Sequence, residues 1–222
     1  MRTISFYSKA YLPAHVDSLI QYSAMAAELG RNYDAFTTAA EAVDLATEPA
    51  TPQIVSDDVA AKALTNLAAI RYGTGDAAAG ADPIRRATRL IDNLATRRGK
   101  TDRAGDAQLL RAAAYNQRAL IEATLGDTAA ALASAEIAVA TYKDISDTHG
   151  ASHAGLPGAL NNLANVYRQR SEYSARLSRQ RRSASSSSDR LVRELARHPF
   201  RTHRCRCLPV AGAEALPARP PS

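Results

Sequence analysis

Alanine is the residue that most constrains how this chain can fold. The 222 residues include 47 Ala and no Trp, and aromatic residues make up only 5%. Ala has the highest helix propensity and adds no bulk between neighbours, so a chain of this kind builds a core best from closely packed helices. A membrane span is not expected, because the most apolar stretch, residues 128–140, is short and contains Glu136. The composition therefore predicts an all-α protein.

A short turn sequence recurs between helical patterns. It occurs as Gly30-Arg31, Gly75-Asp76 and Gly126-Asp127, and in a weaker form as Ser171-Glu172. Each pair follows one apolar helical period and precedes another, as expected for a series of helical hairpins.

Around these turns the chain resembles the tetratricopeptide-repeat family, whose frame of about 34 residues can be laid over residues 16–49, 61–94, 112–145 and 157–190. Small residues occupy the eighth, twentieth and twenty-seventh frame positions of the first three copies: Ser23, Ala35, Ala42, Ala68, Gly80, Ala87, Ala119, Ala131 and Ala138. The fourth copy begins with Ala164 but then places Arg176 where a small residue is needed. The resemblance implies a right-handed α-solenoid of stacked antiparallel helix pairs, with three repeats and an incomplete fourth.

Prolines and caps predict where several helices begin. Leu12-Pro13 and Leu156-Pro157 each place a proline just inside a helix start, where its missing N–H costs nothing. Ser56 is a candidate N-cap. Pro83 predicts that its helix begins late, with Asp82 as the cap, because proline cannot donate to the preceding turn. The basic segment 97–105, with its two glycines, predicts a mobile loop.

The chain has three predicted regions. The resemblance covers a repeat domain over 12–173, which a lead-in over 1–11 precedes, and charge sets apart a mostly disordered tail over 174–222. The tail holds 11 Arg and 3 acidic residues, whereas the rest is slightly acidic. Within the tail, the serine tract 183–188 reads as a linker. The abrupt change at Ser174 suggests the hypothesis that the tail is translated in a shifted frame or belongs to a truncated relative of a longer array.

The candidates for chemistry in this sequence are weak. His198, His203, Cys205 and Cys207 offer zinc-ligand types, but the Cys-x-Cys spacing is poor for a structural site. If the arginines bind nucleic acid, base stacking is not expected, since Phe200 is the only aromatic residue after Tyr173. We expect no enzyme activity, no metal and no cofactor. With both cysteines in the tail, a reducing, cytoplasmic location is expected.

The family resemblance implies a peptide-binding groove along the first helix of each hairpin. Its frame positions give Lys62, Thr65, Tyr72, Asn116, Asn161, Asn165 and Arg168, continued in the first hairpin by Ile20, Ala24 and Ala27. Asn offers both a donor and an acceptor to an extended peptide. The competing interpretation is that the Asn side chains fix the stacking of the hairpins, and that Tyr72 and Tyr115 only pack.

The function predicted is that of a non-catalytic scaffold that binds a peptide or partner protein. The resemblance further implies a fragment or relative of a regulatory protein. Two alternatives remain open. The uncapped ends of the array could cover each other in a homodimer, or the arginine-rich tail could bind nucleic acid with strong salt dependence.

Overall fold

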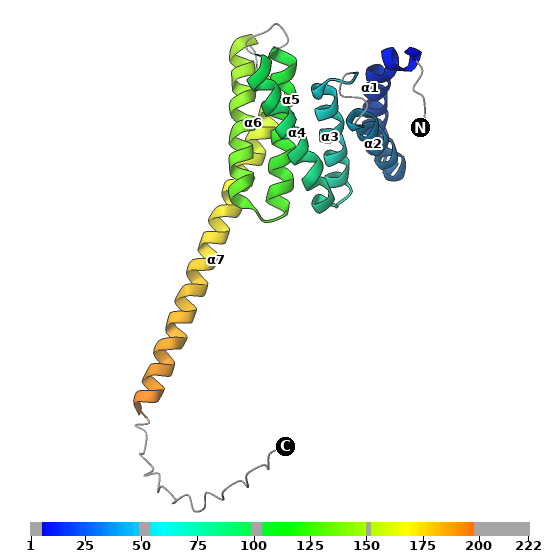
Figure 1. Ribbon diagram of the computed structural model, residues 1–222. Helices are drawn as coiled ribbons and strands as arrows, with labels where there is room; N and C mark the ends of the chain where they lie inside the picture. Colours follow the sequence, from blue (N-terminus) through cyan, green and yellow to red (C-terminus); the bar gives the residue numbers. More distant parts are fainter. Residues whose placement is uncertain (1–5, 49–53, 99–103, 150–151, 198–222) are drawn as a thin grey trace, which may run out of the picture. The chain divides into compact units, whose positions relative to one another are not determined.

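The computed structural model describes residues 6–48, 54–98, 104–149 and 152–197, and every regular element within these ranges is an α-helix. Figure 1 labels the helices: α1 (Phe6–Glu28), α2 (Asn32–Thr47), α3 (Asp57–Gly73), α4 (Ala77–Arg98), α5 (Ala104–Thr124), α6 (Thr128–His149) and α7 (Gly155–Arg197). The all-α prediction is confirmed. None of the described helices combines the length and apolar character that a membrane crossing requires.

The helices are grouped in hairpins. Helix α1 packs against α2, α3 against α4, and α5 against α6 (Figure 1). Successive hairpins contact each other through α2 with α3 and α4 with α5, while α3 also touches α1 and α5. This arrangement fits a helical repeat; the handedness of the stack and the number of repeats stay predictions. The chain divides into two compact units, Met1–Ser174 and Ala175–Ser222.

The predicted turns are confirmed at three glycines. Gly30, Gly75 and Gly126 have φ angles of 72°, 87° and 85°, in the left-handed region that glycine adopts without a steric penalty. Asp76 and Asp127, the residues after the second and third turns, then cap the next helix. Their Oδ1 atoms accept hydrogen bonds from the backbone N–H of Ala79 and Ala130, each at 3.0 Å.

The fourth predicted turn, Ser171-Glu172, is wrong, because α7 continues through it to Arg197. The structure also corrects the predicted disordered tail and serine linker, since residues 174–197, including 183–188, are helical. The sequence between Gly158 and Pro199 contains no glycine or proline, so nothing in this stretch forces a helix to end. The predicted zinc ligands His198, His203, Cys205 and Cys207, and the centre of the predicted mobile loop, lie outside the described residues.

Two predicted helix starts are also wrong. Helix α1 already begins at Phe6 and contains Pro13, and α4 begins at Ala77 and contains Pro83. In α4 the cap is Asp76 instead of Asp82, so a well-capped first turn outweighs the one backbone hydrogen bond that proline cannot donate. Helix α7 begins at Gly155, so Pro157 lies in its first turn as predicted.

The small residues lie where helices touch in the first three hairpins. Side chains at the eighth and twenty-seventh frame positions are fully buried: Ser23, Ala42, Ala68, Ala87, Ala119 and Ala138. At Gly80, an added Cβ would lie 3.1 Å from the Ala68 carbonyl oxygen and 3.2 Å from Ile121 Cδ1. The small side chains therefore allow the close approach on which an alanine-rich core depends. Ala164, the matching residue of α7, is exposed.

Candidate functional site

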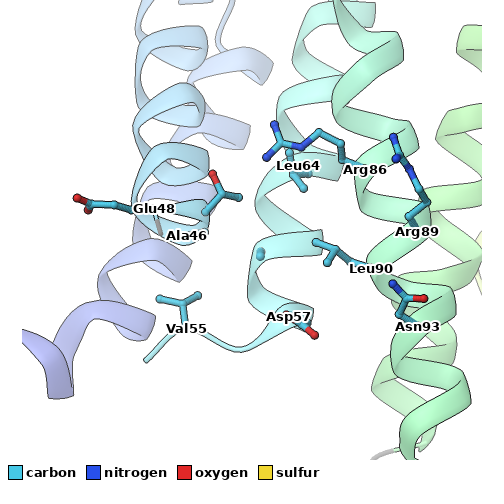
Figure 2. A pocket seen from close by; sticks show the side chains of 11 residues that line it. Ala46, Glu48, Val55, Asp57, Leu64, Arg86, Arg89, Leu90 and Asn93 are labelled. Carbon is cyan, nitrogen blue, oxygen red and sulfur yellow. The ribbon is translucent and has the colours of Figure 1, made fainter. Parts of the chain in front are cut away.

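Two of the clefts lined by described residues of the first compact unit could receive a ligand. One, here called the α2–α4 cleft, lies among α2, α3 and α4 and has a volume of about 420 Å³ (Figure 2). The other, here called the α3–α5–α7 cleft, has a volume of about 190 Å³. Its lining residues are Tyr72, Ala119, Leu120, Ala123, Thr124, Asn162, Asn165, Val166, Arg168 and Gln169.

Three of the seven predicted groove residues line the α3–α5–α7 cleft: Tyr72, Asn165 and Arg168. Arg168 Nη2 donates a hydrogen bond to Asn165 Oδ1 over 3.3 Å, so the guanidinium and the amide already lie side by side. The guanidinium has further N–H groups, and a planar fork of this kind is suited to a carboxylate. The cleft therefore has the donors that recognition of an acidic group needs.

Sequence reasoning missed the two other amide side chains of this cleft, Asn162 and Gln169. They lie three before and four after Asn165, so the three amides share one face of α7. That helical spacing was the signal that could have found them. The frame borrowed from the resemblance excluded them, because its groove positions are offset by one residue.

The other predicted groove residues have different surroundings. Lys62 and Asn161 are exposed and do not line the cleft. The Thr65 hydroxyl donates to the Ala61 carbonyl of its own helix at 2.8 Å. Asn116 Oδ1 accepts a hydrogen bond from Asn162 Nδ2 at 2.9 Å, which links α5 to α7. The competing interpretation of the asparagines as stacking residues thus holds for this pair.

A similar link joins the first two hairpins. Asn66 Nδ2 of α3 donates to the buried Ser23 Oγ of α1 at 2.7 Å. Gln117 occupies the same frame position in α5 as Asn66 in α3, but its buried Nε2 finds no partner among the described residues. Polar side chains of the first helices therefore link α1 to α3 and α5 to α7.

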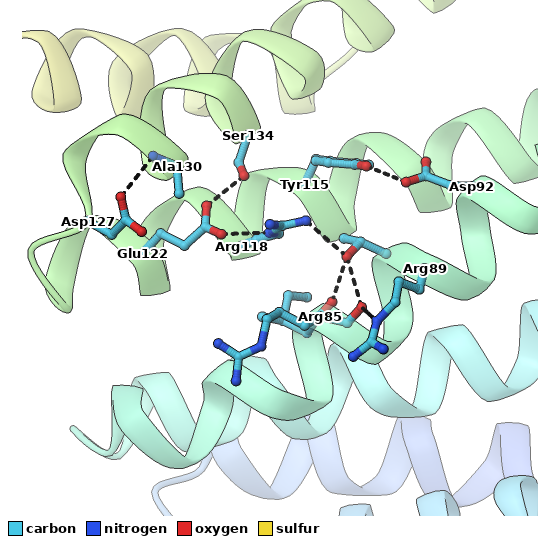
Figure 3. Close-up of polar contacts among 11 residues, drawn as sticks. Arg85, Arg89, Asp92, Tyr115, Arg118, Glu122, Asp127, Ala130 and Ser134 are labelled. Atoms are coloured by element: carbon cyan, nitrogen blue, oxygen red, sulfur yellow. Dashed lines mark hydrogen bonds and ion pairs between the residues drawn. The ribbon is translucent and has the colours of Figure 1, made fainter.

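A polar network joins α4, α5 and α6 (Figure 3). Arg118 Nε donates to Glu122 Oε1 at 2.7 Å, and Ser134 Oγ donates to Glu122 Oε2 at 2.6 Å. Arg118 Nη1 also donates to Thr88 Oγ1 at 3.3 Å. Every partner in this network is contributed by a helix of the stack, so the network explains why the polar side chains of Thr88 and Ser134 can be buried.

Tyr115 is buried beside this network. Its hydroxyl donates to Asp92 Oδ2 at 2.6 Å, and Arg111 Nε lies 3.5 Å from the other oxygen of Asp92. Burial, followed by the hydrogen bond to Asp92, raises the pKa of Tyr115 to about 12. A phenol held neutral in this way ties α5 to α4 and is a packing residue, as the competing interpretation proposed.

Among the described residues, no group of three or more His, Cys, Asp or Glu side chains could hold a metal ion. The polar groups described above either connect helices or line a small cleft. These features define a class: an all-α protein of stacked helical hairpins whose described polar groups mainly link one helix to another.

The chain belongs to the adenovirus L4-33K/L4-22K family, whose model matches residues 15–204. Proteins of this family are regulatory and interact with other factors. A search among curated proteins gives no match.

The family match corrects the resemblance to tetratricopeptide repeats, which is wrong. The physical reason is that small residues at helix crossings are required wherever α-hairpins stack closely. Such a pattern identifies a mode of packing and does not identify a family.

Proposed function

We propose that this chain is a non-catalytic regulatory module that holds a peptide of a partner protein in the α3–α5–α7 cleft, with a carboxylate of the peptide beside Arg168. The observation that carries the proposal is the convergence of Tyr72, Asn165 and Arg168, on two different helices, at one cleft. Membership in a family of regulatory proteins that interact with other factors supports the general role. The cytoplasmic location stays a prediction.

The size of the cleft limits what it can hold. A volume of about 190 Å³ suits one anchoring side chain, or the end of a peptide, and is too small for a folded segment. Arg168 would pair with the carboxylate of an Asp, a Glu or a chain terminus. Asn165 and Gln169 would bond the adjacent peptide backbone, since each amide both donates and accepts.

Two other residues of α7 hold this part of the helix in place before a peptide arrives. Val166 is buried, and Asn162 is fixed by its hydrogen bond to Asn116. A preformed cleft of this kind loses less conformational entropy on binding than a loop would.

The proposal can be tested with a displayed library of random peptides selected on the immobilised full chain. We expect the selected peptides to share an acidic residue and to bind Arg168→Ala about tenfold or more weakly, equivalent to about 1.4 kcal/mol. Arg170→Ala is the matched control, because Arg170 is an exposed arginine of the same helix that does not line the cleft. An equal loss of peptide affinity in Arg168→Ala and Arg170→Ala would contradict the proposal. So would the selection of peptides without acidic residues.

Self-association is a second candidate, favoured by the exposed apolar side chains Leu160 and Tyr167 on α7. A second copy could cover them and bury apolar area. Light scattering over a dilution series would show a mass that falls toward the monomer, and Leu160→Lys would shift that transition to higher concentration. Nucleic-acid binding by the tail remains the third alternative, and removal of residues 174–222 would abolish it.

A further inference from the structure

The larger α2–α4 cleft lies apart from the groove considered so far. Its volume of about 420 Å³ falls in the range of sites that bind small molecules. It is lined by Ala46, Thr47, Glu48, Val55, Asp57, Ala60, Leu64, Arg86, Arg89, Leu90 and Asn93. None of these residues lines the α3–α5–α7 cleft.

The inner part of the α2–α4 cleft is apolar. Val55, Ala60 and Leu64 are only 3%, 6% and 1% exposed, and the half-buried Leu90 packs against the same core cluster. In Figure 2 the Leu90 side chain extends from α4 toward α3. Such walls provide no hydrogen bonds, so they favour an apolar body in a ligand.

The α4 side of the cleft is cationic. Arg86 and Arg89 are exposed and three residues apart, so they project from one face of the helix, with Asn93 one turn further (Figure 2). The opposite face of α4 is anchored by the buried Ile84 and Ile91. Arg89 Nε donates to the Arg85 carbonyl at 3.3 Å, which leaves its terminal N–H groups for other partners. No ion pair of either arginine is found within the described part of the chain.

Two carboxylates also lie at this cleft, and they limit the charge of a ligand. Glu48 and Asp57 each have interactions of their own, and the Glu48 carboxylate points away from the arginines in Figure 2. Their negative charge would repel a ligand carrying several charges. A single anionic group beside Arg86 and Arg89 avoids most of that repulsion.

We propose that the α2–α4 cleft binds a small anionic amphiphile, meaning an apolar body with one carboxylate, sulfonate or phosphate group. The apolar body would lie against Val55, Leu64 and Leu90. The anionic group would lie between the guanidinium groups of Arg86 and Arg89, with the Asn93 amide within reach. The ligand would contact α2, α3 and α4 together, so it would also stabilise the junction of the first two hairpins by mass action.

The test uses anilinonaphthalene sulfonate, a fluorescent aromatic sulfonate, titrated into the full chain. We expect saturable binding that weakens tenfold or more, about 1.4 kcal/mol, in the double variant Arg86→Gln, Arg89→Gln. The matched control is Arg85→Gln, because Arg85 is an exposed arginine of the same helix that does not line the cleft. Decanoate should displace the dye, whereas decanol, which lacks the charge, and inorganic phosphate, which lacks the apolar body, should not.

A second variant separates specific binding from adsorption of the dye to exposed apolar surface. Asn93→Trp places an indole at the rim of the cleft, so it should reduce dye binding while the helical circular dichroism stays unchanged. Dye binding that is equal in the wild type, the double variant and Asn93→Trp would overturn the proposal, as would displacement by phosphate alone. Arg168→Ala should leave dye binding unchanged, so failure here is distinguishable from failure of the peptide proposal.

Discussion

The hairpin α3–α4 and the start of α7 have similar residues at matching positions but very different surroundings. Leu64 and Ala68 on α3 are 1% and 0% exposed. Their counterparts on α7, Leu160 and Ala164, are both exposed, and Leu160 has an exposed fraction of 42%. On α3 these side chains meet α4 and the neighbouring hairpins, whereas the second helix of a fourth hairpin does not form, because α7 extends through the expected turn to Arg197. The same residue type is therefore a core residue in one place and a surface residue in the other.

The largest expected effect comes from enlarging the two matching alanines. Ala68→Leu should lower the free energy of unfolding by about 1 to 3 kcal/mol, because the close helix contact has no room for the added carbons. Ala164→Leu should change it by less than about 0.5 kcal/mol, as is usual for exposed positions. Chemical denaturation followed by circular dichroism measures both. Similar losses in the two variants would show that α7 is covered by a partner, such as a second copy.

Two glycine substitutions sharpen the comparison between α3–α4 and α7, because they should change the free energy of unfolding in opposite directions. An added Cβ at Gly80 meets the Ala68 backbone oxygen at 3.1 Å, whereas at Gly158 it meets nothing within 4 Å. Gly158→Ala should raise the free energy of unfolding by about 0.5 to 1 kcal/mol through helix propensity. Gly80→Ala should lower it, because a backbone atom of a packed helix cannot move aside cheaply. Thermal unfolding shows whether each substitution raises or lowers stability. If both substitutions stabilise the protein, the crossing of α3 and α4 has room for an added Cβ at Gly80.

The last prediction concerns two tyrosines and the dependence of stability on pH. Its effect on the free energy of unfolding appears only at alkaline pH. Burial raises the pKa of Tyr115 from 10.0 to about 12, whereas the raised pKa of the exposed Tyr167 comes first from its hydrogen bond to Glu136. Since the folded state holds the Tyr115 proton more tightly than the unfolded state, its contribution to stability is complete below pH 10 and is lost as the pH rises toward 12. Denaturation at increasing pH should show this loss in the wild type.

The variants Tyr115→Phe and Tyr167→Phe form a matched pair for this measurement. Tyr115→Phe should flatten the alkaline loss, and Tyr167→Phe should leave most of it in place. A wild-type profile that is unchanged by Tyr115→Phe would contradict the assignment of the alkaline loss to this phenol.

Several local features could be predicted from the sequence because they depend on near neighbours alone. The turns at Gly30, Gly75 and Gly126 follow from the need for a left-handed residue at a helix end. The burial of Ala42, Ala87 and other small residues follows from the demand for close contact between helices. Of the residues that line the α3–α5–α7 cleft, the repeat frame predicted Tyr72, Asn165 and Arg168.

The features that sequence reasoning missed depend on competition between interactions. The start of α4 depends on whether the stabilisation by the Asp76 cap outweighs the loss of the backbone hydrogen bond that Pro83 cannot donate. The polar links from Asn162 to Asn116 and from Arg118 to Thr88 cross between helices far apart in sequence, and no local pattern specifies such partners. The borrowed repeat frame also shifted the expected groove away from Asn162 and Gln169.

By itself, the sequence determined that this chain would form alanine-packed helices joined by glycine turns, because helix propensity and side-chain size are properties of single residues. Only the tertiary structure decided which of these helices are covered and which polar groups meet at the two clefts. Those outcomes depend on which surfaces come together, because a close-packed contact is determined by the residues of both helices that form it.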